Sequence, residues 1–184
     1  MISKQAYVDP TAKLGNNVEV MPFAFIGEDV EIGDNCIIMP YAGVLKGTTI
    51  GKNNRIHGHA LLGVDPQDFK YHGEASRLIV GDNNDIRENV VIARGTHADR
   101  ATKIGNGNHI MEKVHICHDA DIHDNTVLGI ATIIAGNTVI ENEAILSTKE
   151  TELDDFHLSK AGAEFKKTFL RILSQVVIPL FTTV

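Results

Sequence analysis

The chain has 184 residues, a formal net charge of −7, no tryptophan and only 5% aromatic residues. This length allows one domain with a buried core, and the acidic balance argues against nucleic acid as the main partner. Residues 1–5 contain no apolar signal segment, and no apolar run is long enough to span a membrane. Cys36 and Cys117 lie far apart and form no metal-binding spacing. We therefore expect a cytoplasmic protein with reduced thiols, without stable membrane insertion and without a nucleic-acid ligand.

An aliphatic residue recurs at every sixth position from residue 2 to residue 146, with two interruptions. A period of six matches neither the 3.6 residues of an α-helical turn nor the alternation of a half-buried strand. Repeats of six residues are typical of a parallel β-helix, in which short strands wind into stacked triangular coils of about 18 residues. We therefore predict an all-β fold with an interior of isoleucine, valine and leucine. The repeat consists of Ile2, Val8, Leu14, Val20, Ile26, Ile32, Ile38, Val44, Ile50, Ile56, Leu62, Val80, Ile86, Ile92, Ile104, Ile110, Ile116, Ile122, Leu128, Ile134, Ile140 and Leu146.

The residues between the aliphatic positions suit the corners of such coils. A position two residues before many of the aliphatics holds small or β-branched residues, for example Cys36 and Thr126. Glycines such as Gly15 and Gly33 follow the aliphatics directly, and paired asparagines such as Asn53–Asn54 recur. Because glycine and asparagine both tolerate a positive φ, we expect them to form the turns.

Two segments interrupt the repeat without shifting its phase, as loops that project from a solenoid do. The first covers residues 64–79 and the second covers residues 93–103. Such insertions usually lie on the binding face of a repeat protein. After Leu146 the repeat stops, and apolar residues recur at three- to four-residue spacing. We therefore predict a β-helix over residues 1–147 and a short C-terminal tail over residues 148–184, with an α-helix from about residue 159 to residue 178 that ends before Pro179.

The string from His115 to Asp119 holds two histidines and an aspartate within five residues. Three six-residue repeats separate His118 from Gly136, so these positions are equivalent on successive coils. Hydrogen-bonded strands lie about 4.8 Å apart, which places Gly136 directly beside His118. A histidine next to a residue without a side chain predicts a reactive site, because a substrate has room to reach the imidazole.

Four strings resemble the acyl-[acyl-carrier-protein]–UDP-N-acetylglucosamine O-acyltransferase family, the hexapeptide-repeat acyltransferases of lipid A biosynthesis. They are Gln67–Glu74 (QDFKYHGE), Ile86–Val90 (IRENV), Arg94–Thr96 (RGT) and His115–Asp119 (HICHD). The resemblance covers the chain from its N-terminus to about Ser147. It implies a left-handed parallel β-helix, an exception to the usual right-handed crossover, that assembles as a homotrimer with active sites between subunits.

The resemblance also implies an acyltransferase that moves a 3-hydroxyacyl group from acyl carrier protein to the 3-hydroxyl of UDP-N-acetylglucosamine. His118 is then the general base, because the pKa of imidazole lies near the working pH. Asp119 orients the imidazole, and the backbone N–H of Gly136 stabilises the oxyanion. No metal ion and no cofactor are expected. The residues expected to bind the substrate are Gln67, Asp68, Lys70 and His115.

The sequence after Ser147 departs from the family, whose longer β-helix and helical domain have no counterpart in residues 148–184. The nucleotide-binding residues of the family are thus missing from this shortened, divergent C-terminus, and Ala93 and Asn137 replace family histidines. One alternative is therefore a catalytically impaired, truncated paralogue that acts as a trimeric scaffold. Another is a γ-carbonic-anhydrase-like site, which shares the fold and binds Zn²⁺ through three histidines. Its ligands would be His118, His123 and either His97 or His115.

Overall fold

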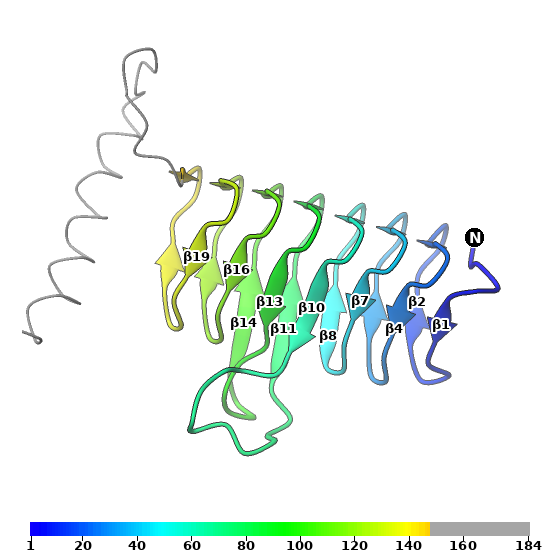
Figure 1. The fold of residues 1–184 in the computed structure, drawn as a ribbon, viewed down its shortest axis with the longest axis horizontal. Coiled ribbons are helices and arrows are strands. Elements are labelled where there is room, and N and C mark those ends of the chain that lie inside the picture. Colours follow the sequence, from blue (N-terminus) through cyan, green and yellow to red (C-terminus); the bar gives the residue numbers. More distant parts are fainter. Residues whose placement is uncertain (148–184) are drawn as a thin grey trace, which may run out of the picture. The chain divides into compact units, whose positions relative to one another are not determined.

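The computed structural model describes residues 1–147, which form three parallel β-sheets of seven strands each (Figure 1). Successive strands of the chain belong to different sheets, so every third strand returns to the same sheet one coil further along. No helix occurs within residues 1–147. The predicted left-handed parallel β-helix is confirmed, whereas the predicted tail and its α-helix lie outside the described residues.

In each sheet, the strands of successive coils lie side by side. The first sheet contains β1 (Tyr7–Val8), β4 (Phe25–Ile26), β7 (Gly43–Val44), β10 (Leu61–Val64), β13 (Val91–Ala93), β16 (His115–Ile116) and β19 (Ile133–Ile134). The second contains β2 (Lys13–Leu14), β5 (Glu31–Ile32), β8 (Thr48–Ile50), β11 (Arg77–Val80), β14 (Ala101–Ile104), β17 (Asp121–Ile122) and β20 (Val139–Ile140). The third contains β3 (Glu19–Val20), β6 (Ile37–Ile38), β9 (Arg55–Ile56), β12 (Asp85–Ile86), β15 (His109–Ile110), β18 (Val127–Leu128) and β21 (Ile145–Leu146).

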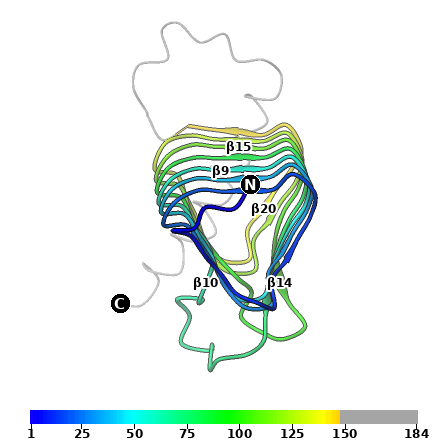
Figure 2. The same ribbon diagram turned by 90° about the vertical axis from the view of Figure 1, so that its right-hand side faces the viewer.

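The six-residue repeat builds the core of this prism, whose triangular cross-section appears in the view along the coils (Figure 2). The aliphatic residue of each strand points inward and pairs with its equivalent on the next coil, as Ile56 does with Ile86 and Ile86 with Ile110. All three side chains are fully buried. Each such side chain contributes about 1.5–3 kcal/mol through burial, which favours aliphatic residues at these positions.

Positive φ angles recur at the corners, three residues after the aliphatic positions. Asn17, Asn35 and Asn53 have φ angles of 56°, 58° and 57°, as the paired asparagines led us to expect. The expectation for the glycines directly after the aliphatics is wrong at Gly33, which does not have a positive φ. A Cβ atom on Gly33 would instead lie 2.7 Å from the backbone of Gly51. Glycine is required there because adjacent coils approach closely, and not because of its backbone angles.

The second asparagine of two such pairs points into the prism. Asn54 and Asn84 are buried, and Asn54 accepts hydrogen bonds from the backbone and side-chain amides of Asn84 at 2.9 and 3.0 Å. Asn84 in turn accepts a hydrogen bond of 2.8 Å from the amide of Asn108 on the next coil. These hydrogen bonds between successive coils pair polar groups that would be costly to bury without a partner.

Both interruptions of the repeat leave the prism at one corner, between the first and second sheets (Figure 2). β10 extends to Val64 and β11 starts at Arg77, so the first loop comprises residues 65–76. β13 ends at Ala93 and β14 starts at Ala101, so the second loop comprises residues 94–100. Both are shorter than the expected segments, because the strands beside them are longer than two residues.

Candidate active site

Four successive coils bring the predicted site together at the corner from which the loops project. In chain order this corner carries loop 65–76, loop 94–100, the pair His118–Asp119 between β16 and β17, and the pair Gly136–Asn137 between β19 and β20. We call this region the loop corner. It results from parallel stacking, since residues one coil apart become direct neighbours.

His118 lies between two carboxylates. Its Nδ1 atom is 2.9 Å from Oδ2 of Asp119, and its Nε2 atom is 3.4 Å from Oδ2 of Asp68 in loop 65–76. An ionised carboxylate can only accept a hydrogen bond, and the contact of Nδ1 with Asp119 is the shorter of the two, so a neutral imidazole with its proton on Nδ1 keeps a lone pair on Nε2. That arrangement is the one a general base requires.

Asp119 is fixed by residues from the coil before it. Its carboxylate accepts hydrogen bonds from the Thr96 hydroxyl at 2.7 Å and from the Thr96 amide at 3.2 Å, and its own amide donates to the Thr102 hydroxyl at 2.8 Å. Burial alone would raise the pKa of Asp119, but the hydrogen bonds from Thr96 and His118 outweigh it and hold this pKa below its ordinary value. Asp119 is therefore ionised when it binds His118.

Gly136 faces the imidazole of His118 directly. A Cβ atom on Gly136 would lie 2.6 Å from Cε1 and 2.8 Å from Nε2 of His118, so no larger residue fits without moving the ring. Within residues 1–147 the Gly136 N–H has no hydrogen-bond acceptor, whereas the amide of Asn137 donates to the His118 carbonyl at 3.1 Å. Within the described coils, Gly136 therefore keeps an unpaired N–H and approaches the His118 ring closely.

The remaining predicted binding residues do not join this contact group. Gln67 and Lys70 are exposed in loop 65–76, where the backbone amide of Lys70 donates to the carboxylate of Asp68 at 2.8 Å. His115 lies on the outer face of the first sheet, between Val91 and Ile133 of the neighbouring strands. The structure therefore gathers Asp68, His118, Asp119 and Gly136 but leaves the side chains of Gln67, Lys70 and His115 at the periphery.

A groove open to solvent leads away from the loop corner along the outer face of the second sheet. It starts at Asp119 and Asn137 and continues past Ile79, Lys103 and Val139. Arg100 lines its entrance and donates a hydrogen bond of 3.1 Å to the side chain of Asn137. The groove borders Asp119 and Asn137, which follow His118 and Gly136 directly in the chain.

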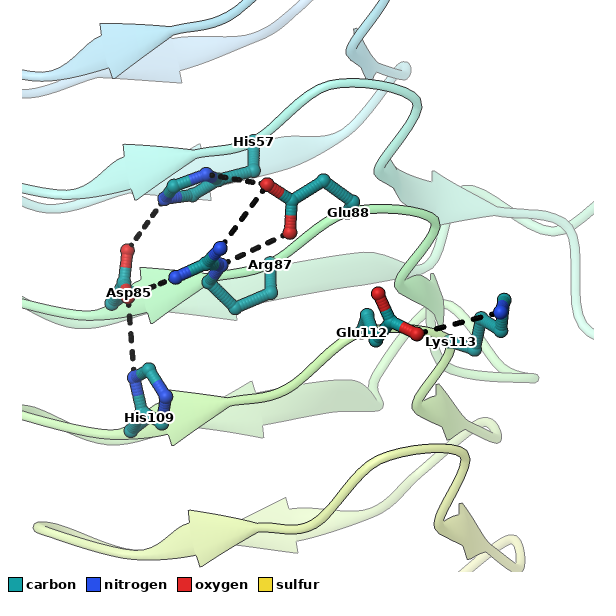
Figure 3. A network of polar contacts seen from close by, with 7 residues as sticks. All are labelled: His57, Asp85, Arg87, Glu88, His109, Glu112 and Lys113. Carbon is teal, nitrogen blue, oxygen red and sulfur yellow. Dashed lines mark hydrogen bonds and ion pairs between the residues drawn. The ribbon is translucent and has the colours of Figure 1, made fainter.

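The sequence alone did not indicate the roles of Thr96 and Thr102 in holding Asp119, nor the contacts of Arg94 described below. Its only signal was the Arg94–Thr96 string, to which no role could be attached. The Ile86–Val90 string does not reach the loop corner. Arg87 and Glu88 belong to a polar network on the third sheet, together with His57, Asp85 and His109 (Figure 3).

The histidines of the metal-site alternative do not cluster within one chain. His123 lies 3.2 Å from Glu141, away from the partners of His118. Across residues 1–147, no group of three or more histidine, cysteine, aspartate or glutamate side chains is arranged to hold a metal ion. In the same part of the chain no helix is long and apolar enough to cross a bilayer.

Known proteins share both the sequence and the fold of the β-helix. Residues 11–39 and 29–63 match the family model for bacterial transferase hexapeptide (six repeats). The chain is 54% identical over 147 residues to the acyl-[acyl-carrier-protein]–UDP-N-acetylglucosamine O-acyltransferase of Pseudomonas putida strain W619, a match that covers 79% of this chain and 57% of that protein. The same enzyme of Stutzerimonas stutzeri strain A1501 is 47% identical over 148 residues, covering 80% and 57%. The predicted resemblance is confirmed.

Solved structures agree with the sequence relatives. A UDP-N-acetylglucosamine acyltransferase from Bacteroides fragilis superposes with a TM-score of 0.78 and 49% identity, covering 80% of this chain and 58% of its own. The UDP-N-acetylglucosamine O-acyltransferase of Moraxella catarrhalis gives a TM-score of 0.67 and 33% identity, covering 79% and 62%. This chain thus spans less than two thirds of the length of these hexapeptide-repeat acyltransferases, and the shared part is their β-helix.

Proposed function

We propose that the protein transfers a 3-hydroxyacyl group from acyl carrier protein to the 3-hydroxyl of UDP-N-acetylglucosamine. The observation that carries the proposal is the arrangement of His118, with Asp119 on Nδ1 and with Gly136 facing the Nε2 side of the ring. The names of the relatives supply the two substrates. A cytoplasmic location and a place at the first step of lipid A biosynthesis, which the resemblance implies, form part of the same proposal.

In this reaction Nε2 of His118 takes the proton of the acceptor hydroxyl, and the hydroxyl oxygen forms a bond with the thioester carbonyl carbon. The carbonyl oxygen becomes an oxyanion, which the Gly136 N–H, unpaired within residues 1–147, is suited to stabilise. When the carbon–sulfur bond breaks, the departing thiolate takes from His118 the proton that came from the acceptor hydroxyl. The products are an ester of the sugar and the free thiol of the carrier.

In this scheme Asp68 binds the acceptor sugar. Its carboxylate lies 3.4 Å from Nε2, at the position that the attacking hydroxyl approaches. It can accept a hydrogen bond from a second polar group of the sugar and thereby align the hydroxyl with the base. The groove past Lys103 and Val139 would receive the donor, because it borders Asp119 and Asn137, the chain neighbours of His118 and Gly136.

We also propose that the protein is a homotrimer, with the first sheet facing a second copy. Tyr7, Phe25, Leu61 and Ile133 on the outer face of that sheet are 40–75% exposed, and Tyr7 stacks on Phe25 with ring centroids 5.0 Å apart. An exposed apolar face of this kind is typical of an interface. The loop corner borders this face, so a neighbouring copy would lie beside His118.

The test of the assembly is light scattering coupled to gel filtration of the full chain. We expect a mass of three chains, and we expect Phe25→Lys to lower it, while Val127→Lys on the third sheet serves as the matched control. A monomer in the wild type, or an equal effect of both substitutions, would contradict the proposed interface.

The test of the activity is the transfer of a radiolabelled 3-hydroxyacyl group from its carrier protein to UDP-N-acetylglucosamine by the full chain. We expect a product that alkali cleaves, as an ester requires, and none from an acceptor that lacks the 3-hydroxyl. A folded protein that binds both substrates without forming product would overturn the proposal in favour of the scaffold alternative.

A further inference from the structure

Arg94 is anchored against loop 65–76 by several contacts at once. Its guanidinium donates to the carbonyl of Gly63 at 3.0 Å, contacts the hydroxyl of Tyr71 and pairs with the carboxylate of Asp65. It also lies over the ring of Tyr71, 5.5 Å from the centroid, and its side chain is only 12% exposed. Arg94 therefore contacts Gly63 at the end of β10 and two residues within the loop, on both sides of Asp68.

Thr96 lies two residues further along the chain and binds the other carboxylate of the site. Its hydroxyl and amide both donate to Asp119. Between the two, Gly95 is buried so tightly that a Cβ atom would lie 2.8 Å from the Arg100 carbonyl and 3.0 Å from Oδ1 of Asp119. The backbone of the segment at Gly95 thus packs closely against Arg100 and Asp119 at the loop corner.

The two carboxylates held in this way are those on either side of His118. Thr96 fixes Asp119 on the Nδ1 side by direct hydrogen bonds, and Arg94 fixes the loop from which Asp68 reaches Nε2. One three-residue segment therefore sets the orientation of the base and the position of the loop residue in front of it.

We propose that Arg94 is a positioning residue for the acceptor sugar, acting through loop 65–76 and Asp68. This inference rests on the proposed function, since it assigns Asp68 to the acceptor side of the reaction. Arginine suits the role because its planar fork can bind a carbonyl, a hydroxyl and a carboxylate simultaneously, which a lysine ammonium on a flexible stem cannot do in the same geometry.

The kinetic test compares Arg94→Gln, Arg94→Lys and Asp68→Ala with the wild type, and uses Arg55→Gln on the exposed face of β9 as the matched control. We expect Arg94→Gln to raise KM for UDP-N-acetylglucosamine by about tenfold to hundredfold, with KM for the acyl carrier protein unchanged. Arg94→Lys should recover part of the loss. The double variant Arg94→Gln/Asp68→Ala should be little worse than Asp68→Ala alone, because both changes act on one contact.

A second measurement does not depend on turnover. Amide hydrogen exchange should accelerate in residues 65–76 of Arg94→Gln and stay unchanged in the strands of the first and third sheets. If the wild type transfers no acyl group, the proposed function fails, yet the exchange and the calorimetric affinity for UDP-N-acetylglucosamine still test Arg94. Unchanged exchange in the loop, or additive effects of Arg94→Gln and Asp68→Ala on acceptor affinity, would overturn the inference.

Discussion

His118 and His57 each lie between two carboxylates, yet only His118 is suited to take a proton from a substrate. His118 at the loop corner and His57 on the third sheet are similarly buried, with side chains 14% and 10% exposed. Nε2 of His57 lies 2.7 Å from Asp85 and Nδ1 lies 3.2 Å from Glu88, so both ring nitrogens are engaged (Figure 3). Asp85 also contacts His109, and Arg87 binds Glu88 at 3.0 Å, which closes the network.

The difference lies in what the next coil places against each ring. Ile56 pairs with Ile86 on the next coil, so Arg87 occupies the position equivalent to His57. Ile116 pairs with Ile134 in the same way, so Gly136 occupies the position equivalent to His118. Both carboxylates around His57 also come from the rigid coil of β12, while Asp68 comes from a loop and is 3.4 Å from Nε2. A base needs one accessible nitrogen, and the absent side chain of Gly136 provides the space.

Replacing each histidine by alanine should separate the two sites most strongly. We expect His118→Ala to lower the rate of the proposed acyl transfer by about 10²–10⁴, because it removes the proposed general base. His57→Ala should leave the rate near that of the wild type but lower the free energy of unfolding by about 1–3 kcal/mol, because Asp85 and Glu88 lose a buried partner. Steady-state transfer assays and urea unfolding measure the two effects. Equal losses of activity would remove the distinction between the sites.

A methyl group on the glycine at each site probes the space around the ring. Gly136→Ala should lower the rate by about 10²-fold, because a Cβ 2.6 Å from Cε1 forces the imidazole out of its alignment with Asp119. Gly58→Ala next to His57 is the matched control, since its Cβ would meet only the Pro40 carbonyl at 3.1 Å. This control should keep its activity. A fully active Gly136→Ala enzyme would show that the close approach is unimportant for catalysis.

The pH dependence of stability should reveal the ionised Asp119. Its folded-state pKa is held below the ordinary value, so its charge stabilises the fold above the unfolded pKa of about 3.9, and this contribution is lost as the pH falls through the folded pKa. Asp119→Asn should therefore lower the free energy of unfolding at pH 7, and the loss should become progressively smaller below pH 4. Unfolding curves of both proteins at several pH values provide the check. A pH-independent difference would mean that the charge is not what stabilises this position.

Replacing Glu88 in the polar network on the third sheet should have the smallest effect on the free energy of unfolding. The hydrogen bond from Arg87, followed by one from the backbone amide of Glu88, holds the pKa of Glu88 at about 2. Its side chain is 39% exposed, so solvent screening limits the stabilisation to about 1 kcal/mol or less. Glu88→Gln should lose this contribution above pH 4.5, and the two proteins should converge as the pH approaches 2. Differential scanning calorimetry in low salt measures it, and a larger loss than for Asp119→Asn would reverse the order proposed.

Much of the fold could be predicted because each coil repeats the same local rule. The aliphatic residues, the small corner residues and the asparagines with positive φ are each visible at six-residue spacing. Glycines such as Gly33 were misinterpreted, because the close approach of Gly51 joins residues that are distant in the chain. The inward turn of Asn54 and Asn84 was missed for the same reason, since their hydrogen-bond partners lie on other coils.

By itself, the sequence determined the period of the coils, and with it the pairing of His118 and Gly136, because a fixed repeat makes equivalent positions neighbours. Only the tertiary structure decided that Asp68 reaches Nε2, that Thr96 holds Asp119 and that Arg94 anchors the loop. These contacts link segments that leave the repeat, and a loop follows no period from which its end point can be calculated. The physical reason is that strand register is set by local packing of the core, whereas the path of a loop depends on the few polar contacts that hold it.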